Sequence, residues 1–356
     1  MSFQQVPQRK SPSLSLKTAN ERGESRGEQI MRLTEAPGMA AATEASVSAL
    51  RRVVLVANQK GGVGKTSIVT ALAGLIARPE RRVLIVDADP QGNATSSDLG
   101  VVGDRGRSLM MSLQYGEPLQ MQRDVRPGLD LIAGGPLLAQ VGALTATAAQ
   151  TGLDLVANLR GALAHVCMRG NYTVVFIDSG PGDAPLLDAL LRITRYLVVP
   201  TKDDDASMSG VELLAMRYLK ARQEGAAVQL LGVVLFDANP RATARNSQVL
   251  ADLDVMLEGS GARSFQTMIR SDHAAALDLR AGHLTPSELV EASSKQNRLR
   301  LANLRRGKGR HRADDMPPDN EPRLWSRDPS ALASDYQSLA REVLGRIAAA
   351  ETGFRS

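Results

Sequence analysis

Residues 60–67 read KGGVGKTS, and their types and spacing are those of a phosphate-binding loop. Glycines let the backbone turn so that successive N–H groups point at phosphate oxygens. A helix that starts at Thr66 adds the positive end of its dipole to the same place. In such a loop Lys65 reaches the β- and γ-phosphates, and the Thr66 hydroxyl ligates Mg²⁺. The expected nucleotide contacts are Gly61, Gly62, Val63, Gly64, Lys65, Thr66 and Ser67.

The loop departs from the general pattern in two neighbouring positions. The pattern has a glycine five residues before Gly64, where this chain has Gln59, and a second lysine follows at Lys60. Phosphoryl transfer asks the protein mainly for positioning and charge stabilisation, and a cationic finger often completes the site. Lys60 is the natural candidate for that finger, either within one subunit or across a dimer interface.

Acidic residues close two further apolar runs. Asp87 and Asp89 lie in VDADPQGNAT, and Asp178 lies in FIDSGPG. A buried carboxylate without a partner is costly, so water or Mg²⁺ is the expected partner. We expect Asp89 to orient the attacking water, Asp87 to support either the metal shell or the loop geometry, and Asp178 to stand near Mg²⁺ as a Walker B carboxylate. The candidate metal residues are Thr66, Asp87 and Asp178, and the candidate catalytic residues are Lys60, Lys65 and Asp89.

Short apolar, β-branched runs alternate with stretches of helical spacing. The expected strands are 53–57, 82–87, 129–133, 172–178, 196–200, 229–236 and 263–269, and the expected helices include 67–77, 153–168 and 210–224. This alternation predicts right-handed βαβ crossovers and a doubly wound, mostly parallel sheet with helices on both faces. Ligands of such sheets bind at the carboxyl ends of the strands, where the loop and the aspartates fall.

Composition narrows the class of protein. The single cysteine, Cys167, excludes a disulfide framework within the chain and a cysteine-rich metal or cluster site. No run approaches the roughly 18 apolar residues of a membrane span, and the first 30 residues lack the apolar region of a signal peptide. We therefore expect a soluble, cytoplasmic protein. The net charge of +5 favours an anionic partner.

Four motifs together carry a family resemblance. KGGVGKTS, VDADPQGNAT, FIDSGPG and VVPT, in this order and spacing, resemble the ParA/Soj-like partition ATPases, the deviant Walker A group that includes MinD and the nitrogenase iron protein. The resemblance spans roughly residues 51–347. It implies ATP and Mg²⁺ as cofactors, water activation by Asp89, and an ATP-bound sandwich homodimer in which Lys60 reaches the partner's nucleotide. It also adds Pro200 of VVPT to the nucleotide contacts.

The same resemblance implies partners. ATP-bound dimers of the family bind DNA without sequence preference, and a ParB-like centromere-binding protein stimulates hydrolysis. The segments NPRATARNSQ (239–248) and IRSD resemble the family's DNA-facing elements, which makes Arg241, Arg245 and Arg270 candidate phosphate contacts. The family's proline before the last arginine is absent here. The expected function is partition of plasmid or chromosomal DNA at the nucleoid, with no membrane partner.

The resemblance also indicates how the chain is divided into domains. Residues 50–350 form the expected ParA-type ATPase domain, and residues 1–49 form an extension without a sustained apolar period, for which we expect disorder. Between 295 and 312 stand eight Lys and Arg residues and no acid, with Gly307, Gly309 and then three prolines. We expect a basic loop insertion at about 291–328. It either extends a phosphate-binding surface or is a solvated loop.

Other functions of the same group fit the sequence less well. A MinD-like membrane cycle needs a terminal basic amphipathic helix with bulky anchors, and IAAAETGFRS has only Phe354. An electron-transfer iron protein needs several cysteine thiolates. A tyrosine kinase of this group would have a tyrosine-rich tail, and no tyrosine follows Tyr336. Positioning of a protein or membrane-bound cargo by the same ATPase chemistry stays open as the alternative.

Overall fold

The computed structural model describes residues 45–182, 184–306 and 323–353. Residues from Ser46 onward form one compact unit, to which the following description applies. The predicted N-terminal extension up to residue 44 and residues 307–322 of the predicted basic insertion lie outside the described residues.

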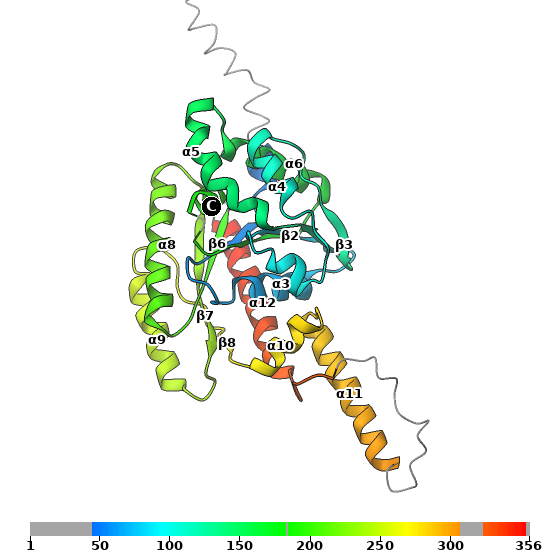
Figure 1. Ribbon diagram of the computed structural model, residues 1–356. Helices are drawn as coiled ribbons and strands as arrows, with labels where there is room; N and C mark the ends of the chain where they lie inside the picture. Colours follow the sequence, from blue (N-terminus) through cyan, green and yellow to red (C-terminus); the bar gives the residue numbers. More distant parts are fainter. Residues whose placement is uncertain (1–44, 183, 307–322, 354–356) are drawn as a thin grey trace, which may run out of the picture. The chain divides into compact units, whose positions relative to one another are not determined.

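One eight-stranded sheet, with the order β3-β4-β2-β5-β1-β6-β7-β8, forms the centre of this unit (Figure 1). Every neighbouring pair is parallel except β3 and β4, which are antiparallel. This confirms the predicted doubly wound, mostly parallel α/β fold. The strands are β1 (Val53–Val56), β2 (Val83–Ala88), β3 (Gln122–Arg126), β4 (Leu129–Ile132), β5 (Val174–Ser179), β6 (Tyr196–Thr201), β7 (Gln229–Ala238) and β8 (Ile269–Arg270).

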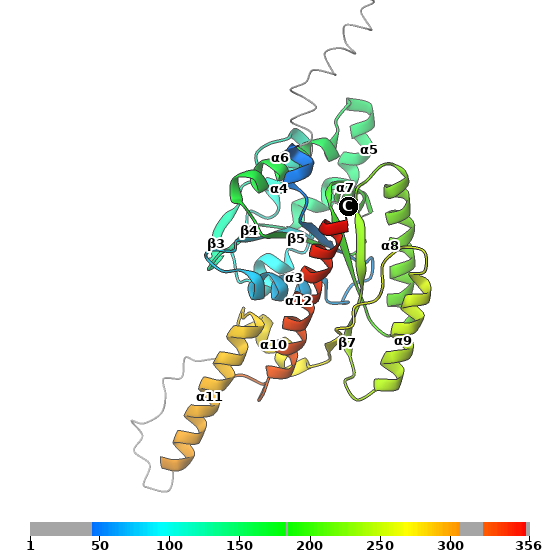
Figure 2. The same ribbon diagram turned by 180° about the vertical axis from the view of Figure 1, so that it is seen from behind.

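Helices cover both faces of the sheet (Figures 1 and 2). One apolar layer joins the sheet to α4 (Arg107–Tyr115), α5 (Val141–Thr151), α6 (Leu155–Gly170), α7 (Ala184–Ile193), α8 (Asp205–Gln223) and α9 (Thr243–Met256). The other joins it to α3 (Lys65–Ile76), α10 (His273–Ala281), α11 (Pro286–Arg306) and α12 (Ser330–Gly353). Short helical turns occupy Ala94–Asp98 and Pro136–Gln140. Along β1, Val53 and Leu55 face the first layer while Val54 and Val56 face the second, so the strand is buried on both sides.

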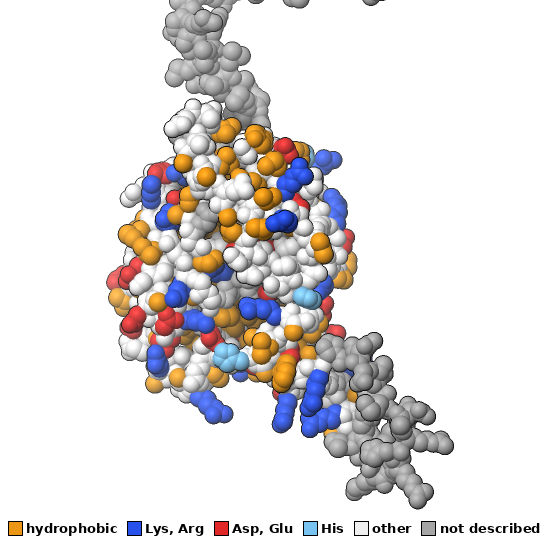
Figure 3. Space-filling model, viewed as in Figure 1, with side chains coloured by type: hydrophobic (Ala, Val, Ile, Leu, Met, Phe, Trp, Pro, Cys, Tyr) orange, Lys and Arg blue, Asp and Glu red, His pale blue; other side chains and the backbone are white. Residues whose placement is uncertain are grey.

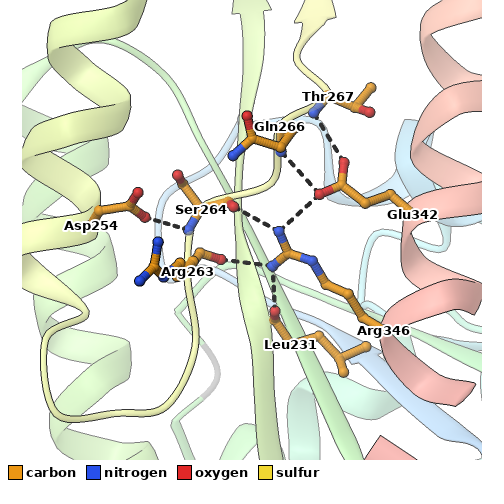
Figure 4. A network of polar contacts seen from close by, with 8 residues as sticks. All are labelled: Leu231, Asp254, Arg263, Ser264, Gln266, Thr267, Glu342 and Arg346. Atoms are coloured by element: carbon orange, nitrogen blue, oxygen red, sulfur yellow. Dashed lines mark hydrogen bonds and ion pairs between the residues drawn. The ribbon is translucent and has the colours of Figure 1, made fainter. Parts of the chain in front are cut away.

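The predicted strand over 263–269 is wrong for most of its length. Only Ile269–Arg270 pairs with β7, because side chains of α12 bind the backbone ahead of it (Figure 4). The Glu342 carboxylate accepts two backbone N–H groups, and the Arg346 guanidinium donates to three carbonyls. Backbone polar groups satisfied in this way have no need of a ladder. The groups bound are the N–H groups of Gln266 and Thr267 and the carbonyls of Leu231, Arg263 and Ser264.

The predicted loop at 291–328 is wrong over 291–306, because α11 continues to Arg306, whereas residues 323–328 belong to no helix or strand, as expected of a loop. The start of the helix is a capping box: Thr285 N–H donates to Glu288 Oε2 at 2.7 Å, and Glu288 N–H donates to Thr285 Oγ1 at 3.3 Å. Pro286 occupies the first helical position, which favours helix initiation. The glycines that suggested a loop, Gly307 and Gly309, lie outside the described residues.

Candidate nucleotide-binding site

The glycine-rich loop connects β1 to α3 at the carboxyl edge of the sheet, and a buried asparagine holds its start. Asn58 is 1% exposed. Its Nδ2 donates to the Pro200 carbonyl at 2.8 Å, and its Oδ1 accepts the Lys60 N–H at 2.9 Å. Asn58 thus ties the loop to the end of β6 and places Pro200 beside the loop. Sequence analysis missed Asn58, although a polar amide directly after a buried strand was a usable signal.

Gly64 makes the turn into α3. Its φ of +87° favours glycine, and a Cβ there would lie 2.4 Å from the Phe236 ring. Gly64 is also the N-cap of α3, and no side chain caps the helix. The positive end of the helix dipole therefore faces the loop without a competing side chain. This is the geometry expected of an anion site.

Lys65 is the first residue of α3 and is 6% exposed. Its Nζ donates to the Lys60 carbonyl at 2.9 Å, so the side chain lies back over the loop. Burial lowers the pKa of Lys65, while the carboxylates of Asp178 and Asp89 act in the opposite direction. The Lys60 side chain, by contrast, is exposed. The two lysines of the loop therefore have different surroundings.

Asp178 ends β5 in register with Val56 on one side and Asp87 on the other. It is 0% exposed, and neither carboxylate oxygen has a hydrogen-bond partner, although the Thr66 hydroxyl is close enough to lower its pKa somewhat. Burial, and next the charge of Asp87, raise the pKa of Asp178 well above its ordinary value. A buried carboxylate is expected to be paired, so Asp178 fits a bound cation or its water shell.

Asp87 has partners of its own. Its Oδ2 accepts the backbone N–H of Thr95 at 2.9 Å and the Thr95 hydroxyl at 2.7 Å, and its Oδ1 accepts the Asp89 N–H at 3.2 Å. Burial raises the pKa of Asp87 to about 6, against these hydrogen bonds. Of the two roles considered for Asp87, these bonds favour support of the loop geometry over metal ligation.

Asp89 lies where the two acidic segments meet. It is 4% exposed, and its Oδ1 accepts the Gln91 N–H at 2.8 Å. A Cβ added to Gly180 would lie 2.8 Å from Asp89 Oδ1, so the segment after β5 passes directly against this carboxylate. The fold therefore brings together Lys65, Asp87, Asp89 and Asp178, which are far apart in sequence.

The donor set suits Mg²⁺. Within the described residues no group of three or more His, Cys, Asp or Glu side chains could hold a metal ion. Mg²⁺ is usually bound through one or two protein oxygens together with phosphates and water. Thr66 and the unpartnered Asp178 supply such oxygens beside the loop, and these residues would hold the ion.

A cavity of about 360 Å³ opens beside the loop. Its walls come from α3, from the ends of β7 and β8, and from α10 and α12, and they include Gly64, Ser67, Phe236, Arg270 and Tyr336. The cavity adjoins the phosphate loop, which is where the base and sugar of a nucleotide would extend. Sequence analysis missed this wall because its residues come from five separate elements.

The three arginines predicted to contact DNA do not share one environment. Arg241 and Arg245 are exposed at the start of α9, where Arg245 forms an ion pair with Asp203. Arg270 lines the cavity, and its guanidinium binds both oxygens of Asp335, at 2.5 and 2.7 Å. Its charge is therefore already offset within the chain. The geometry leaves Arg241 and Arg245 as the better candidates for phosphate contact.

A parallel α/β sheet with a glycine-rich phosphate loop after its β1 strand, and carboxylates at the ends of β2 and β5, defines a P-loop ATPase. The sequence model of a family described as "AAA domain" matches residues 51–229. The chain is 36% identical over 187 residues to the chromosome-partitioning ATPase Soj of Thermus thermophilus, covering 52% of this chain and 69% of Soj. It is 32% identical over 188 residues to the chromosome partitioning protein ParA of Caulobacter vibrioides, covering 52% and 68%. The chain belongs to this AAA-domain family, in its Soj/ParA group of ATPases.

Solved structures agree on the fold. A cobyrinic acid a,c-diamide synthase from Mycobacterium smegmatis with ADP and magnesium is 26% identical with a TM-score of 0.53, covering 65% of this chain and 92% of that one. The ParA of pNOB8 bound to nonspecific DNA is 18% identical with a TM-score of 0.51, covering 83% and 98%. At that identity the second likeness concerns the fold alone.

Among the described residues, no helix combines the length and apolar character needed to cross a membrane.

Proposed function

We propose that this ATPase, through a domain at residues 50–350, binds Mg²⁺·ATP, dimerises on it, and in that state binds DNA without sequence preference to partition or position DNA. The observation that carries the proposal is that the side chains of the two loop lysines differ in burial. Lys65 is buried over its own loop, whereas Lys60 has a fixed backbone and an exposed side chain. Such a lysine is suited to a phosphate outside its own subunit.

Within one subunit the roles follow from the geometry. The loop N–H groups and Lys65 bind the phosphates, and Thr66 and Asp178 hold Mg²⁺, which offsets phosphate charge when bound. Asp89 orients the attacking water, and Asp87 fixes the turn at Thr95 that keeps Asp89 in place.

Helix α8 keeps Lys60 directed outward. A Cβ added to Gly210 of α8 would lie 2.4 Å from Asn58 Oδ1 and 3.2 Å from Lys60 Cβ, so α8 packs closely against this part of the loop. Only glycine at that position leaves room for Asn58 to bind the Lys60 N–H. This packing supports the placement of Lys60 at an ATP-dependent dimer interface.

DNA binding is proposed from the relatives named for chromosome partitioning, from the net charge of +5, and from the exposed Arg241 and Arg245. Phosphate neutralisation by such side chains gives binding that is independent of sequence and weakened by salt. A ParB-like protein as the stimulating partner, and a place at the nucleoid, belong to the same proposal.

The test is binding to a nonspecific duplex with ATP, with ADP and without nucleotide, across a salt series. We expect binding with ATP that weakens steeply with salt. Lys65→Ala should lose both ATP and DNA binding, and Asp89→Ala should retain an ATP-bound, DNA-bound dimer because hydrolysis is blocked. Absence of DNA binding in every nucleotide state, with ATP hydrolysis intact, would refute the DNA role and leave an ATPase that positions another cargo.

A further inference from the structure

Residues 297–302 in the second half of α11 have no apolar face packed on the other residues that the structure describes. Its first half contacts α3, α10 and α12, and Leu289 and Ser293 are buried. From residue 297 to residue 302 every side chain is exposed, including Leu299 at 43% and Leu301 at 56% (Figures 1 and 2 show α11 extending away from the sheet). Helices in proteins draw most of their stability from a packed face. This half of α11 therefore presents a surface for a partner.

The exposed part of α11 is one-sided in charge. Lys295, Arg298 and Arg300 are exposed, and no acid occurs from 292 to 313. In Figure 3 several Lys and Arg side chains gather at the lower edge, near the place of α11 in Figure 1. A solvated helix face usually alternates charge signs, and the helix dipole favours cations only in the last turn. Neither charge alternation on a solvated face nor the helix dipole explains three basic residues at these positions, so the positive charge suits an anionic partner.

A tryptophan stands beside this helix on a fixed backbone. Trp325, the only tryptophan of the chain, is 76% exposed. The buried Asp278 carboxylate accepts the N–H of Trp325 at 2.9 Å and the N–H of Ser326 at 2.7 Å. A large indole exposed on a pinned backbone is more typical of a binding surface than of a solvated loop.

The tryptophan segment is bonded to α11 itself. Gln296 accepts the Leu324 N–H at 3.2 Å, and Ser293 and Asn297 each donate to the Arg327 carbonyl at 3.0 Å. These three side chains mark one face of the helix, and helical spacing places Arg300 and Leu301 one turn further along it. We call the set the α11–Trp325 surface: Lys295, Arg298, Leu299, Arg300, Leu301, Arg323, Trp325 and Arg327.

The arrangement of its cations selects duplex DNA over a protein partner. Arg298 and Arg300 are two residues apart and so project about 200° apart around the helix. A protein groove would cover one face of α11 and leave one of these arginines unused. The major groove of DNA admits a helix and has a phosphate strand on each side of it. The exposed stretch 297–302, with Arg298 and Arg300 on opposite sides of the helix, matches that environment.

We propose that the α11–Trp325 surface is a second DNA-backbone contact, separate from Arg241 and Arg245. The inference rests on the proposed DNA binding by this ATPase. Lys295, Arg298 and Arg300 neutralise phosphates on both sides of the helix, and Trp325 packs against the sugar-phosphate backbone beside it.

The experiment compares wild type with the triple variant Lys295→Gln/Arg298→Gln/Arg300→Gln in the full chain, with ATP and a nonspecific duplex. Loss of three phosphate contacts should reduce the slope of log Kobs against log salt by about 2.7. The control variant Arg81→Gln/Arg169→Gln/Lys220→Gln removes the same charge from exposed positions elsewhere and should keep the wild-type slope. Both variants should bind ATP as wild type does.

Trp325 supplies a second readout that needs no substitution. As the only indole, its fluorescence should change when the wild type binds DNA with ATP, and should stay constant with ADP. An unchanged slope in the α11 variant, or a fluorescence response to anionic phospholipid vesicles but none to DNA, would overturn the inference while leaving the proposed function standing. A wild type that binds no DNA in any nucleotide state would overturn both.

Discussion

Two of the three fully buried aspartates of the described sheet differ in their partners, and this difference predicts opposite effects of the same substitution. Asp130 in β4 and Asp178 in β5 are each 0% exposed. Asp130 accepts from the Arg82 guanidinium, the Asp124 N–H and the Tyr172 hydroxyl, whereas no donor bonds to Asp178. We expect Asp130→Asn to destabilise the nucleotide-free protein and Asp178→Asn to stabilise it.

The magnitudes follow from these contacts. Removing the charge of Asp130 weakens a part-buried ion pair with Arg82, which keeps Asp124 as a second partner, and it disturbs the buried hydrogen bonds of Asp130; such a loss costs about 1–3 kcal/mol. Asp178→Asn removes a buried group without a partner, which gains about 1–3 kcal/mol. The substitution also removes the charge repulsion that Asp87 and Asp89 exert on Asp178. The two variants should therefore differ by at least about 2 kcal/mol in the free energy of unfolding.

Urea unfolding in EDTA at pH 7.5, with nucleotide removed, measures both values. Adding Mg²⁺·ATP at 100 times its Kd should stabilise wild type by about 2.7 kcal/mol. Asp178→Asn should gain much less from the ligand because a proposed metal ligand is gone, while Asp130→Asn should gain as wild type does. If Asp178→Asn lowers the stability of the nucleotide-free protein, then Asp178 has a partner and the reasoning is refuted.

Three further predictions concern the same site. Burial raises the pKa of Asp87 from 3.8 to about 6, so between those pH values the folded protein keeps a proton on Asp87 that the unfolded chain has lost, and this group lowers stability by about 3 kcal/mol in all as pH rises; because the pKa of Asp178 is raised as well, the stability of Asp87→Asn should still fall with pH but less steeply than that of wild type, and equal urea-midpoint profiles for the two proteins would contradict the assignment. Gly64→Ala adds a Cβ 2.4 Å from Phe236 at a φ of +87° and should lose ATP binding by calorimetry, whereas Gly152→Ala, with a φ of +70° and nothing within 4 Å, should cost only about 1–2 kcal/mol and keep it. Lys60→Ala should bind ATP with near wild-type affinity yet stay monomeric in ATP by light scattering; an ATP-dependent dimer of this variant would remove the role across the interface.

The parts of the fold that sequence predicts are those whose residues are buried on both faces. β1, β2, β5 and β6 are continuous apolar runs with every residue buried, and such runs stand out from their surroundings. Because parallel strands end at one edge, the aspartates that follow them could be placed together before any coordinates were known. β3, an edge strand that reads QRDVR and has no buried residue, carries no such signal and was missed.

The parts that sequence does not predict depend on contacts between distant residues. The Arg270 guanidinium binds Asp335, 65 positions later, and the sequence around Arg270 does not indicate this contact. The segment before β8 was expected to be a strand, but its backbone groups form hydrogen bonds with the side chains of Glu342 and Arg346 of α12. The wrong loop prediction over α11 had a different cause. The capping box at Thr285 indicates a helix in the sequence itself, but the prediction was based on the later glycines and prolines.

The charges of the site also make a prediction about the metal. Lys65 lies near Asp178 and Asp89, and the phosphates of ATP would bring further negative charge beside carboxylates that are already poorly solvated. Repulsion between two charges about 6 Å apart, at an effective dielectric constant of about 20, is about 3 kcal/mol. ATP without Mg²⁺ should therefore bind wild type about 100-fold more weakly than Mg²⁺·ATP for this reason alone.

Asp178→Asn should reduce this dependence of ATP affinity on Mg²⁺ in two ways. It removes the repulsion of free ATP, which strengthens binding without the metal, and it removes the proposed attraction of the ion, which weakens binding of Mg²⁺·ATP. Calorimetric Kd values with Mg²⁺ and with EDTA should approach each other in this variant, while the wild-type ratio persists in Asp130→Asn, whose side chain is equally buried but bonded to Arg82 and Tyr172. A ratio that stays at the wild-type value in Asp178→Asn would mean that the ion is held elsewhere. The unpartnered oxygens of Asp178 would then need another explanation.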